Sequence, residues 1–157
     1  MQFSVMTKMP PFICMLLALS WADPPFIGEV LDFSAGFRFF PAGNATLSMK
    51  SDSLDDEMVY LLTSTVRTNS FISKFYEVRD EVRSWLSPDN LSLKKTIQII
   101  REGSHHRDYE TLIEGDSLAV SGDNIKSLPG EVYDPVAFVY YLRMLELIQG
   151  NRYKFIS

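Results

Sequence analysis

Apolar and polar residues alternate along most of this chain with a period of two. The alternation is clearest at residues 75–86, where Tyr76, Val82 and Leu86 share one face and charged residues such as Arg79 fill the other. Successive side chains of a β-strand point to opposite faces of the sheet. The pattern therefore predicts a strand at 75–86 with its apolar face turned inward.

Further strands follow from the same period or, at 59–67, from a run rich in β-branched residues and threonine, and clusters of glycine, proline, asparagine and aspartate separate them. A turn is expected at Pro41 and Gly43, and a polar loop at 51–57. Short strands joined in sequence order form an antiparallel meander. The remaining predicted strands are 27–35, 45–49, 59–67, 91–99, 104–113 and 118–120.

The period changes near the C-terminal end of the sequence. Asp134 is suited to cap a helix, Pro135 is suited to a first helical position, and no turn residue follows until Gly150. The predicted helix is apolar nearly all round, so most of its sides need cover. We therefore place it against the concave face of the sheet. The predicted fold class is mainly β: a curved antiparallel sheet with one packed helix near the C-terminus.

After Gly150 the alternation of Tyr153 and Phe155 begins another strand, and the sequence stops within it. This strand is expected either to close the sheet as a short edge or to be the first of several strands that are missing. We expect residues 23–157 to form a single β-rich domain that is incomplete at its C-terminus.

The first 22 residues have the order of a secretory signal peptide. Lys8 precedes an apolar run at 11–19, and the small residues Ser20 and Ala22 stand just before Asp23. We predict a signal peptide at 1–22 that is cleaved after Ala22, so that the protein is periplasmic or otherwise exported. The apolar run is shorter than the roughly 20 residues that span a bilayer, so an integral membrane protein is not expected.

Composition and charge narrow the classes of partner. With 46% hydrophobic and 13% aromatic residues, the chain is typical of globular rather than disordered proteins. Its formal net charge is −5, and loss of Lys8 with the leader makes the remainder more acidic. Nucleic acids and anionic membrane surfaces attract basic patches, so both partners are disfavoured.

Several short motifs along the chain together match one family pattern. They comprise Gly28, Glu29, Phe75, Tyr76, Val78, Asp80, Glu102, Gly103, Asp134, Pro135, Tyr140, Tyr141, Leu142, Arg143 and Gly150. With these residues the chain resembles a bacterial exported family catalogued as domain of unknown function 3108. The resemblance implies an envelope protein with a curved antiparallel sheet, broadly like the half-barrel lipoprotein carriers, and no established enzyme activity. Members of the family typically continue with further strands after the position of Tyr153.

Asp80 is the charged residue that interrupts the inward face of the strand at 75–86. A buried carboxylate is costly unless it is paired. Arg143 is the one cation on the predicted helix, so we predict that Asp80 and Arg143 form an ion pair. A ligand-binding or catalytic role for Asp80 and its exposure through strand twist are the alternatives. Candidate ligand-binding residues are Asp80, Arg143, Tyr140 and Tyr141.

His105 and His106 are the two histidines of the sequence, and they are adjacent on a predicted strand. They point to opposite faces, so they do not easily share one metal ion, and we expect exposed hairpin residues and no metal site. No serine lies in a nucleophile elbow. We expect a non-catalytic binding or carrier protein, without cofactor, for a lipid-like, polymeric or protein ligand of the envelope. The alternative is an envelope hydrolase that uses Asp80 or His105.

Overall fold

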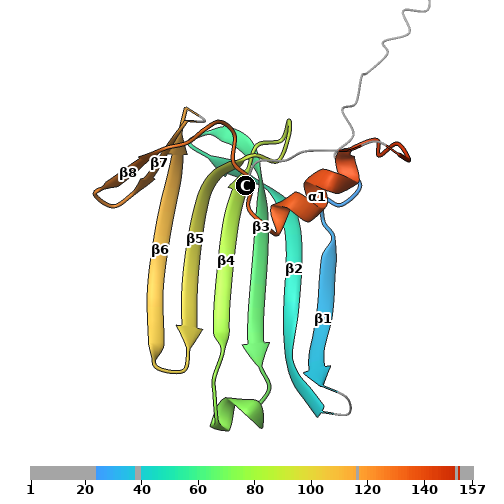
Figure 1. The fold of residues 1–157 in the computed structure, drawn as a ribbon, viewed down its shortest axis with the longest axis vertical. Helices are drawn as coiled ribbons and strands as arrows, with labels where there is room; N and C mark the ends of the chain where they lie inside the picture. Colours follow the sequence, from blue (N-terminus) through green and yellow to red (C-terminus); the bar gives the residue numbers. More distant parts are fainter. Residues whose placement is uncertain (1–23, 38–39, 116, 151, 153–157) are drawn as a thin grey trace, which may run out of the picture.

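The strands of the protein form one antiparallel sheet in sequence order, β1 to β8 (Figure 1). The computed structural model describes residues 24–37, 40–115, 117–150 and 152. The predicted mainly β fold with one helix near the C-terminus is confirmed. The elements are β1 (Val30–Phe37), β2 (Phe40–Leu54), β3 (Glu57–Thr68), the 3₁₀ turn η1 (Ile72–Lys74), β4 (Arg79–Leu86), β5 (Leu93–Glu102), β6 (His105–Glu114), β7 (Leu118–Ser121), β8 (Asn124–Ser127) and α1 (Ala137–Met144).

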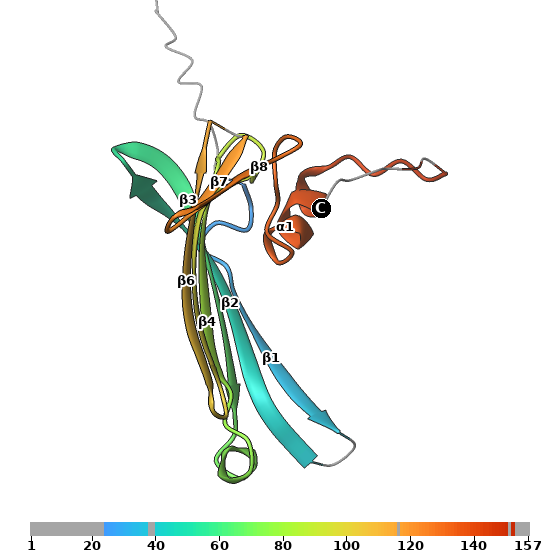
Figure 2. The same ribbon diagram turned by 60° about the vertical axis from the view of Figure 1, so that its left-hand side comes forward.

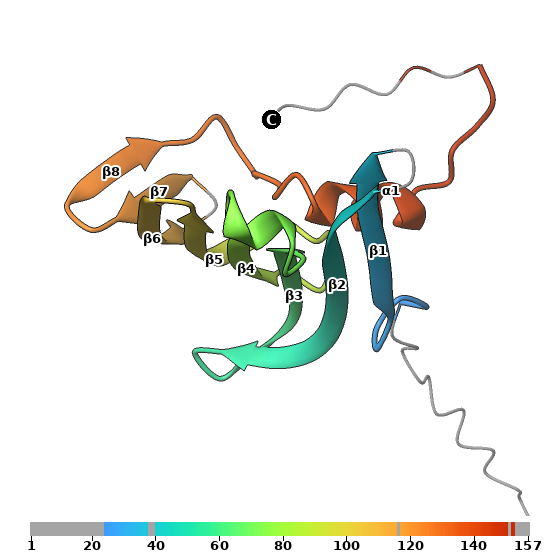
Figure 3. The same ribbon diagram turned by 90° about the horizontal axis from the view of Figure 1, so that it is seen from below.

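The sheet is curved and open, with β1 and β8 at its two edges. Figures 2 and 3 show that the lower parts of β1 and β2 turn out of the plane of the other strands, toward the side on which α1 lies. The helix therefore lies on the concave side, as predicted. It covers only one end of that side, where β2 and β3 leave the sheet for their connecting turn.

A cluster of buried side chains holds α1 against this end of the sheet. Tyr140 of the helix and Phe26, which precedes β1, are both about 1% exposed, and their rings meet edge to face with 5.2 Å between centroids. Burying a large apolar side chain stabilises a fold by about 1.5–3 kcal/mol. The rest of the cluster comes from the strands and the neighbouring chain: Met49, Tyr60, Leu62, Leu86, Leu91 and Ala137.

The carboxylate of Asp134 fixes the start of the helix, as the sequence predicts. Its Oδ1 accepts hydrogen bonds from the backbone N–H groups of Val136 and Ala137, at 2.8 and 3.2 Å. Its Oδ2 accepts a third from the hydroxyl of buried Ser84 on β4, at 3.1 Å. Asp134 thus caps the helix and ties it to the sheet at the same point.

The helix is shorter than predicted, because it ends at Met144 rather than near Gly150. Leu145 has extended backbone angles, and the exposed side chains of Leu147 and Ile148 follow it. A short helix in water depends on tertiary packing. The sheet supplies that packing only along one side of the first two turns, so the prediction that most sides are covered is wrong.

The second strand is longer than predicted at both ends. Pro41 and Gly43 lie inside β2, and Gly43 is paired with Thr68. A Cβ at Gly43 would lie 2.3 Å from the carbonyl oxygen of Arg67, so this glycine permits a close approach of two strands and does not mark a turn. At the far end the strand continues to Leu54, and the tight turn is confined to Asp55 and Asp56, both with positive φ.

Other differences concern β4 and β8. β4 begins at Arg79, because residues 72–74 form η1 and the chain returns to the sheet only after it. β8 was not predicted from the sequence, since its polar residues do not alternate with apolar ones. The proposed signal peptide at 1–22 and the expected strand at 153–157 lie outside the described residues. Within the part of the chain that is described, no helix has the length and apolar character needed to cross a bilayer.

Candidate functional site

The two faces of the sheet differ sharply in chemistry. Ser84 and Leu86 of β4 mark the concave face, because one bonds to Asp134 beside α1 and the other packs in the cluster beneath it. Cross-strand pairing then assigns the remaining residues, since directly paired residues lie on one face. The concave face includes Leu31, Phe33, Ala45, Leu47, Val66, Val82, Ile100 and Tyr109.

Below the helix the concave face is uncovered and carries apolar side chains, among which the polar residues Ser64, Asp80, Gln98 and Arg107 also stand. Phe33, Val66 and Tyr109 are between 40% and 50% exposed. Phe33 and Val66 flank the small Ala45 in one cross-strand row of β1, β2 and β3. A contiguous apolar surface that faces solvent commonly marks a site for a ligand or partner. This part of the concave face is the candidate ligand-binding surface.

The predicted ion pair between Asp80 and Arg143 is wrong. Asp80 does lie on the concave face, half-buried, but its Oδ1 accepts a hydrogen bond from the backbone N–H of Arg101, at 2.9 Å. Asp80 stands near the beginning of β4, whereas α1 lies over the other end of that strand (Figure 1). The two side chains belong to opposite ends of the sheet, which the inward pattern of β4 alone does not reveal.

Arg143 instead pairs with Glu29, just before β1. Two of its guanidinium nitrogens donate to the two carboxylate oxygens of Glu29, at 2.7 and 3.1 Å. The guanidinium also lies over the rings of Phe26 and Tyr140, 5.4 and 5.3 Å from their centroids. The hydrogen bond from Arg143 holds the pKa of Glu29 below its usual range. Arg143 therefore fastens α1 to the N-terminal edge of the sheet, a contact that the sequence analysis missed.

Tyr140 and Tyr141 lie within the helix contacts, away from the uncovered part of the concave face. Tyr140 is buried in the cluster, and burial raises the pKa of its phenol. The Tyr141 ring lies 4.8 Å from that of Tyr133, whose pKa is raised to about 12, chiefly by burial. Their predicted role in ligand binding stays a prediction, and their observed contacts hold the helix in place.

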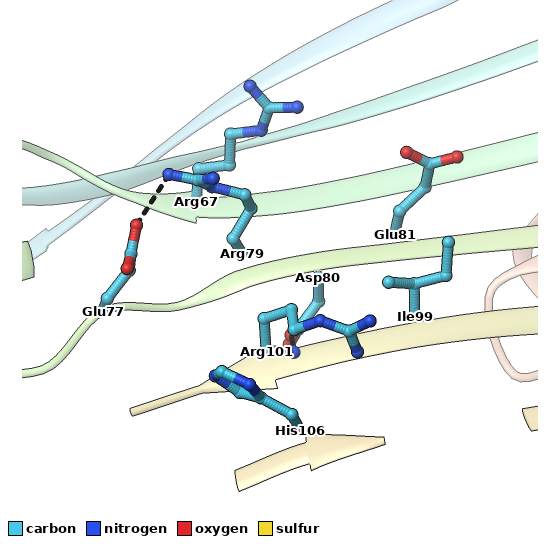
Figure 4. Close-up of a pocket in the computed structure, with 8 residues that line it drawn as sticks. All are labelled: Arg67, Glu77, Arg79, Asp80, Glu81, Ile99, Arg101 and His106. Atoms are coloured by element: carbon cyan, nitrogen blue, oxygen red, sulfur yellow. Dashed lines mark hydrogen bonds and ion pairs between the residues drawn. The ribbon is translucent and has the colours of Figure 1, made fainter. Parts of the chain in front are cut away.

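The convex face carries charged side chains and a half-open groove of about 320 Å³ near the end of the sheet opposite α1 (Figure 4). Glu77 and Glu81 bind Arg79 and Arg83, at 2.7 and 3.2 Å. The convex-face residues that line the groove are Arg67, Glu77, Arg79, Glu81, Ile99, Arg101 and His106. Asp80, which the strand register assigns to the concave face, also borders it.

His105 and His106 are both exposed at the hairpin between β5 and β6, as predicted. The ring Nε2 of His106 lies 3.1 Å from the carbonyl oxygen of Gly103. Asp108 pairs with Arg101 at 2.5 Å, and this contact lowers the pKa of Asp108. A carboxylate with a lowered pKa is poorly matched to acid–base catalysis near neutral pH. Among the described residues no three histidine, cysteine or acidic side chains group to hold a metal ion.

The sheet from the third residue of β1 onward and the helix correspond to a known family. The family model described as "Protein of unknown function (DUF3108)" matches residues 32–155. The chain belongs to this family. No curated protein and no solved structure matches the chain.

The match to the DUF3108 family covers the concave face, Asp80 and the whole of α1. Glu29, which binds Arg143, lies just before its first matched residue. The resemblance seen in the sequence is therefore confirmed as family membership. The family description supplies no activity, so function has to be argued from the surface chemistry of this chain.

Proposed function

We propose that this protein binds and carries an apolar ligand of the bacterial envelope, such as the acyl chains of a lipid, along the concave face of its sheet. It does so in the periplasm, after export directed by the leader at 1–22. Binding and release of the ligand involve no covalent step. The protein acts by removing apolar ligand surface from water and releasing it unchanged.

The exposed apolar residues of the concave face carry this proposal. Phe33 and Val66 form one apolar row with Ala45 across β1, β2 and β3. Tyr109 stands on β6, and Asp80 and Gln98 lie between it and that row. Covering each of these apolar side chains with an acyl chain removes apolar area from water, at about 25 cal/mol per Å². An elongated apolar ligand buries more apolar area on such a surface than a compact one does, because it crosses several strands.

The curvature of the sheet supports the same function. β1 and β2 turn toward the side of α1, so the concave face approaches a ligand from two directions (Figure 3). The helix closes one end of this face through the Phe26 and Tyr140 cluster. An acyl chain lying below α1 therefore has apolar side chains beneath it and at one end, while the charged convex face stays in water.

Binding of a fluorescent fatty-acid probe to matched variants tests the proposal. Val66 and Thr65 are neighbours on β3 that point to opposite faces, so Val66→Asn and Thr65→Asn make a similar change on the concave and convex sides. We expect Val66→Asn to weaken binding about tenfold, because loss of about 1.4 kcal/mol changes an affinity by that factor. Thr65→Asn should bind as the unmodified protein does.

Phe33→Ser extends the test to a second strand and should weaken binding similarly. Circular dichroism and thermal unfolding establish that each variant is folded. Equal affinity of all three variants, or no saturable binding of the probe by the unmodified protein, contradicts a ligand site on the concave face.

A further inference from the structure

Arginines from three neighbouring strands stand in one row on the convex face. Arg67 of β3 is the direct cross-strand partner of Arg79 on β4. The bridge between Val78 and Glu102 continues the register of β4 and β5, which places Arg79 opposite Arg101, and His106 is paired with Arg101 in turn. Figure 4 shows the four side chains around the groove. We call Arg67, Arg79, Arg101 and His106 the arginine row.

Like charges directly opposite each other destabilise a sheet. Two acidic residues partly compensate the row, since Glu77 binds Arg79 and Asp108 binds Arg101. Arg67 is exposed, and no ion pair to it occurs among the described residues. Asp80 and Glu81 also line the groove, so the groove as a whole has no excess of positive charge. Arg67 is the guanidinium of the row that remains available to an anionic group, because Arg79 and Arg101 each have an acidic partner.

Exposed aromatic side chains lie at the same end of the sheet. Phe40 begins β2, and Phe71, Phe75 and Tyr76 come from the connection between β3 and β4. These four residues, which we call the aromatic tip, are between 51% and 77% exposed. Figure 1 shows that this end of the sheet is the one farthest from α1.

The aromatic tip is an ordered structure. Asn69 organises it: its Oδ1 accepts hydrogen bonds from the backbone N–H groups of Phe71 and Ile72, at 3.0 and 2.9 Å, and its side-chain amide donates to the carbonyl of Pro41. The rings of Phe71 and Phe75 meet edge to face, 5.6 Å apart. These contacts hold large apolar rings in water, which is unfavourable. Nothing within the described structure covers these rings, and exposed apolar patches commonly mark interaction sites.

The neighbouring hairpin supports the tip from the other side. Gly103 donates its N–H to the carbonyl of Glu77 at 2.7 Å, and a Cβ at Gly103 would lie 2.9 Å from the ring of Tyr76. The glycine thus leaves room for the tyrosine ring against the β5–β6 hairpin. The aromatic tip and the arginine row are thereby fixed to one another through consecutive residues, from Tyr76 to Arg79.

We propose that the aromatic tip and the arginine row together dock the protein on an anionic lipid bilayer. The aromatic rings enter the boundary between headgroups and acyl chains, where such side chains are favoured. The guanidinium groups bind lipid phosphates, which match their forked donors. The two kinds of side chain are those that a lipid surface recognises, and they occur next to each other.

The distribution of charge explains why an acidic protein can do this. The net charge of −5 disfavours an anionic membrane for the chain as a whole. The connection that carries the aromatic rings is locally basic, because Arg67, Lys74 and Arg79 stand against the single acid Glu77 between residues 67 and 79, and Asp80 and Glu81 follow only within β4. The acidic turn at Asp55 and Asp56 lies at the other end of β2, on the side of the sheet away from α1 (Figures 2 and 3). An anionic surface therefore attracts the tip and repels the helical end, which orients the protein.

Vesicle co-sedimentation of the purified protein tests this inference, with phosphatidylcholine alone and with phosphatidylcholine mixed with phosphatidylglycerol. The double variant Arg67→Gln/Arg79→Gln should lose binding to the mixed vesicles by about fivefold per charge removed. Lys50→Gln/Lys126→Gln is the matched control, since it removes the same net charge from exposed positions outside the tip and should bind as the unmodified protein does. Added salt should weaken binding of the unmodified protein and of the lysine control to the mixed vesicles, and should have less effect on the arginine variant.

Phe71→Ser/Phe75→Ser should reduce binding to both kinds of vesicle, whereas Leu147→Ser/Ile148→Ser, which changes exposed apolar residues near the C-terminal end of the described chain, should not. Absence of vesicle binding, or full binding by the arginine variant, overturns the proposal. So does monomer–dimer exchange that depends on Phe71 and Phe75 without vesicle binding, because the tip then binds a second copy. Docking requires no ligand on the concave face, so either proposal can fail alone.

Discussion

Arg143 illustrates how one cation is accommodated on an otherwise apolar helix. Its guanidinium reaches the edge of the buried cluster, lies over two aromatic rings and meets the carboxylate of Glu29 with two hydrogen bonds. The side chain keeps contact with water, so the pair avoids the desolvation cost of a fully buried ion pair. The charge is placed at the rim of the helix contact, where it strengthens the packing.

The ion pair between Glu29 and Arg143 predicts a pH dependence of stability. Because Arg143 lowers the folded-state pKa of Glu29, the stabilisation is complete above the ordinary glutamate pKa and is lost as the pH falls through the lowered value. Glu29→Gln should therefore destabilise the protein at about pH 7 and have a smaller effect at about pH 3.

Denaturant unfolding of Glu29→Gln at both pH values measures this change. Glu57→Gln serves as the control, since Glu57 is exposed and its side chain forms no ion pair among the described residues. The free energy of unfolding of Glu29→Gln is compared with that of the unmodified protein at each pH. If the difference between the two stays constant from neutral to acidic pH, the ion pair does not stabilise the fold.

The case of Asp80 shows what the sequence can predict at this scale. The alternation in β4 places Asp80 on the inward face, and the structure confirms that placement. The alternation does not indicate which end of β4 lies under α1. Asp80 stands at the end away from α1, so it accepts a hydrogen bond from the backbone of Arg101 and does not reach Arg143. The partner of Arg143 lies 114 residues away, where no local pattern connects the two.

Among the elements, α1 depends on Asp134 more than on its own helical propensity. The helix spans only Ala137–Met144, and short helices are marginal without tertiary contacts. Asp134 connects it to β4 through Ser84 while it satisfies two N–H groups at the helix start. The sequence predicted the cap, but the link to Ser84 required the packed structure.

Replacing Asp134 by alanine should destabilise the protein by about 2–4 kcal/mol, because a cap is lost and the buried hydroxyl of Ser84 loses its acceptor. Urea unfolding measures the change. Asp123→Ala, in the exposed turn between β7 and β8, should alter stability by less than about 0.5 kcal/mol. Similar small effects of both substitutions would mean that Asp134 does not anchor the helix.

Strand prediction succeeded where residue type or flanking turns mark a strand and failed where local geometry overrides them. β3 was predicted within a few residues from its β-branched residues and threonines, β5 from its apolar residues, and β6 from the turns on either side, although most of β6 is exposed. The start of β2 was missed, since Gly43 is needed for close strand approach and reads in sequence as a turn residue. The start of β4 was missed because η1 interrupts an apolar run whose side chains are exposed.

The whole molecule is polarised in two directions. Across the sheet, the concave face carries exposed apolar side chains and the convex face carries the charged groove. The separation is partial, since Asp80 and Arg107 lie on the concave face and Trp85 and Ile97 lie on the convex face. Along the strands, the end that carries α1 and the acidic turn is opposed to the aromatic tip and the arginine row (Figure 1). The first direction follows from residue alternation and was predictable. The second depends on strand register, which brings Arg67, Arg79 and Arg101 into one row from distant parts of the sequence.

The two proposals use this polarity in different ways. A protein docked by the aromatic tip presents its concave face at the bilayer surface, with Phe33 and Val66 in the half of the sheet nearer the tip. An acyl chain then passes from one apolar environment to another over a short distance in water. The closed helical end prevents it from sliding out of the far side of the face.

Photo-crosslinking with a diazirine-bearing fatty acid, followed by peptide mass spectrometry, is the most direct measurement of the concave-face site. We predict adducts on the peptides that contain Phe33, Val66 and Tyr109, and their loss when unlabelled fatty acid is added in excess. Adducts confined to convex residues such as Thr65 and Arg83, or labelling that excess fatty acid does not reduce, would contradict binding of an apolar ligand on the concave face.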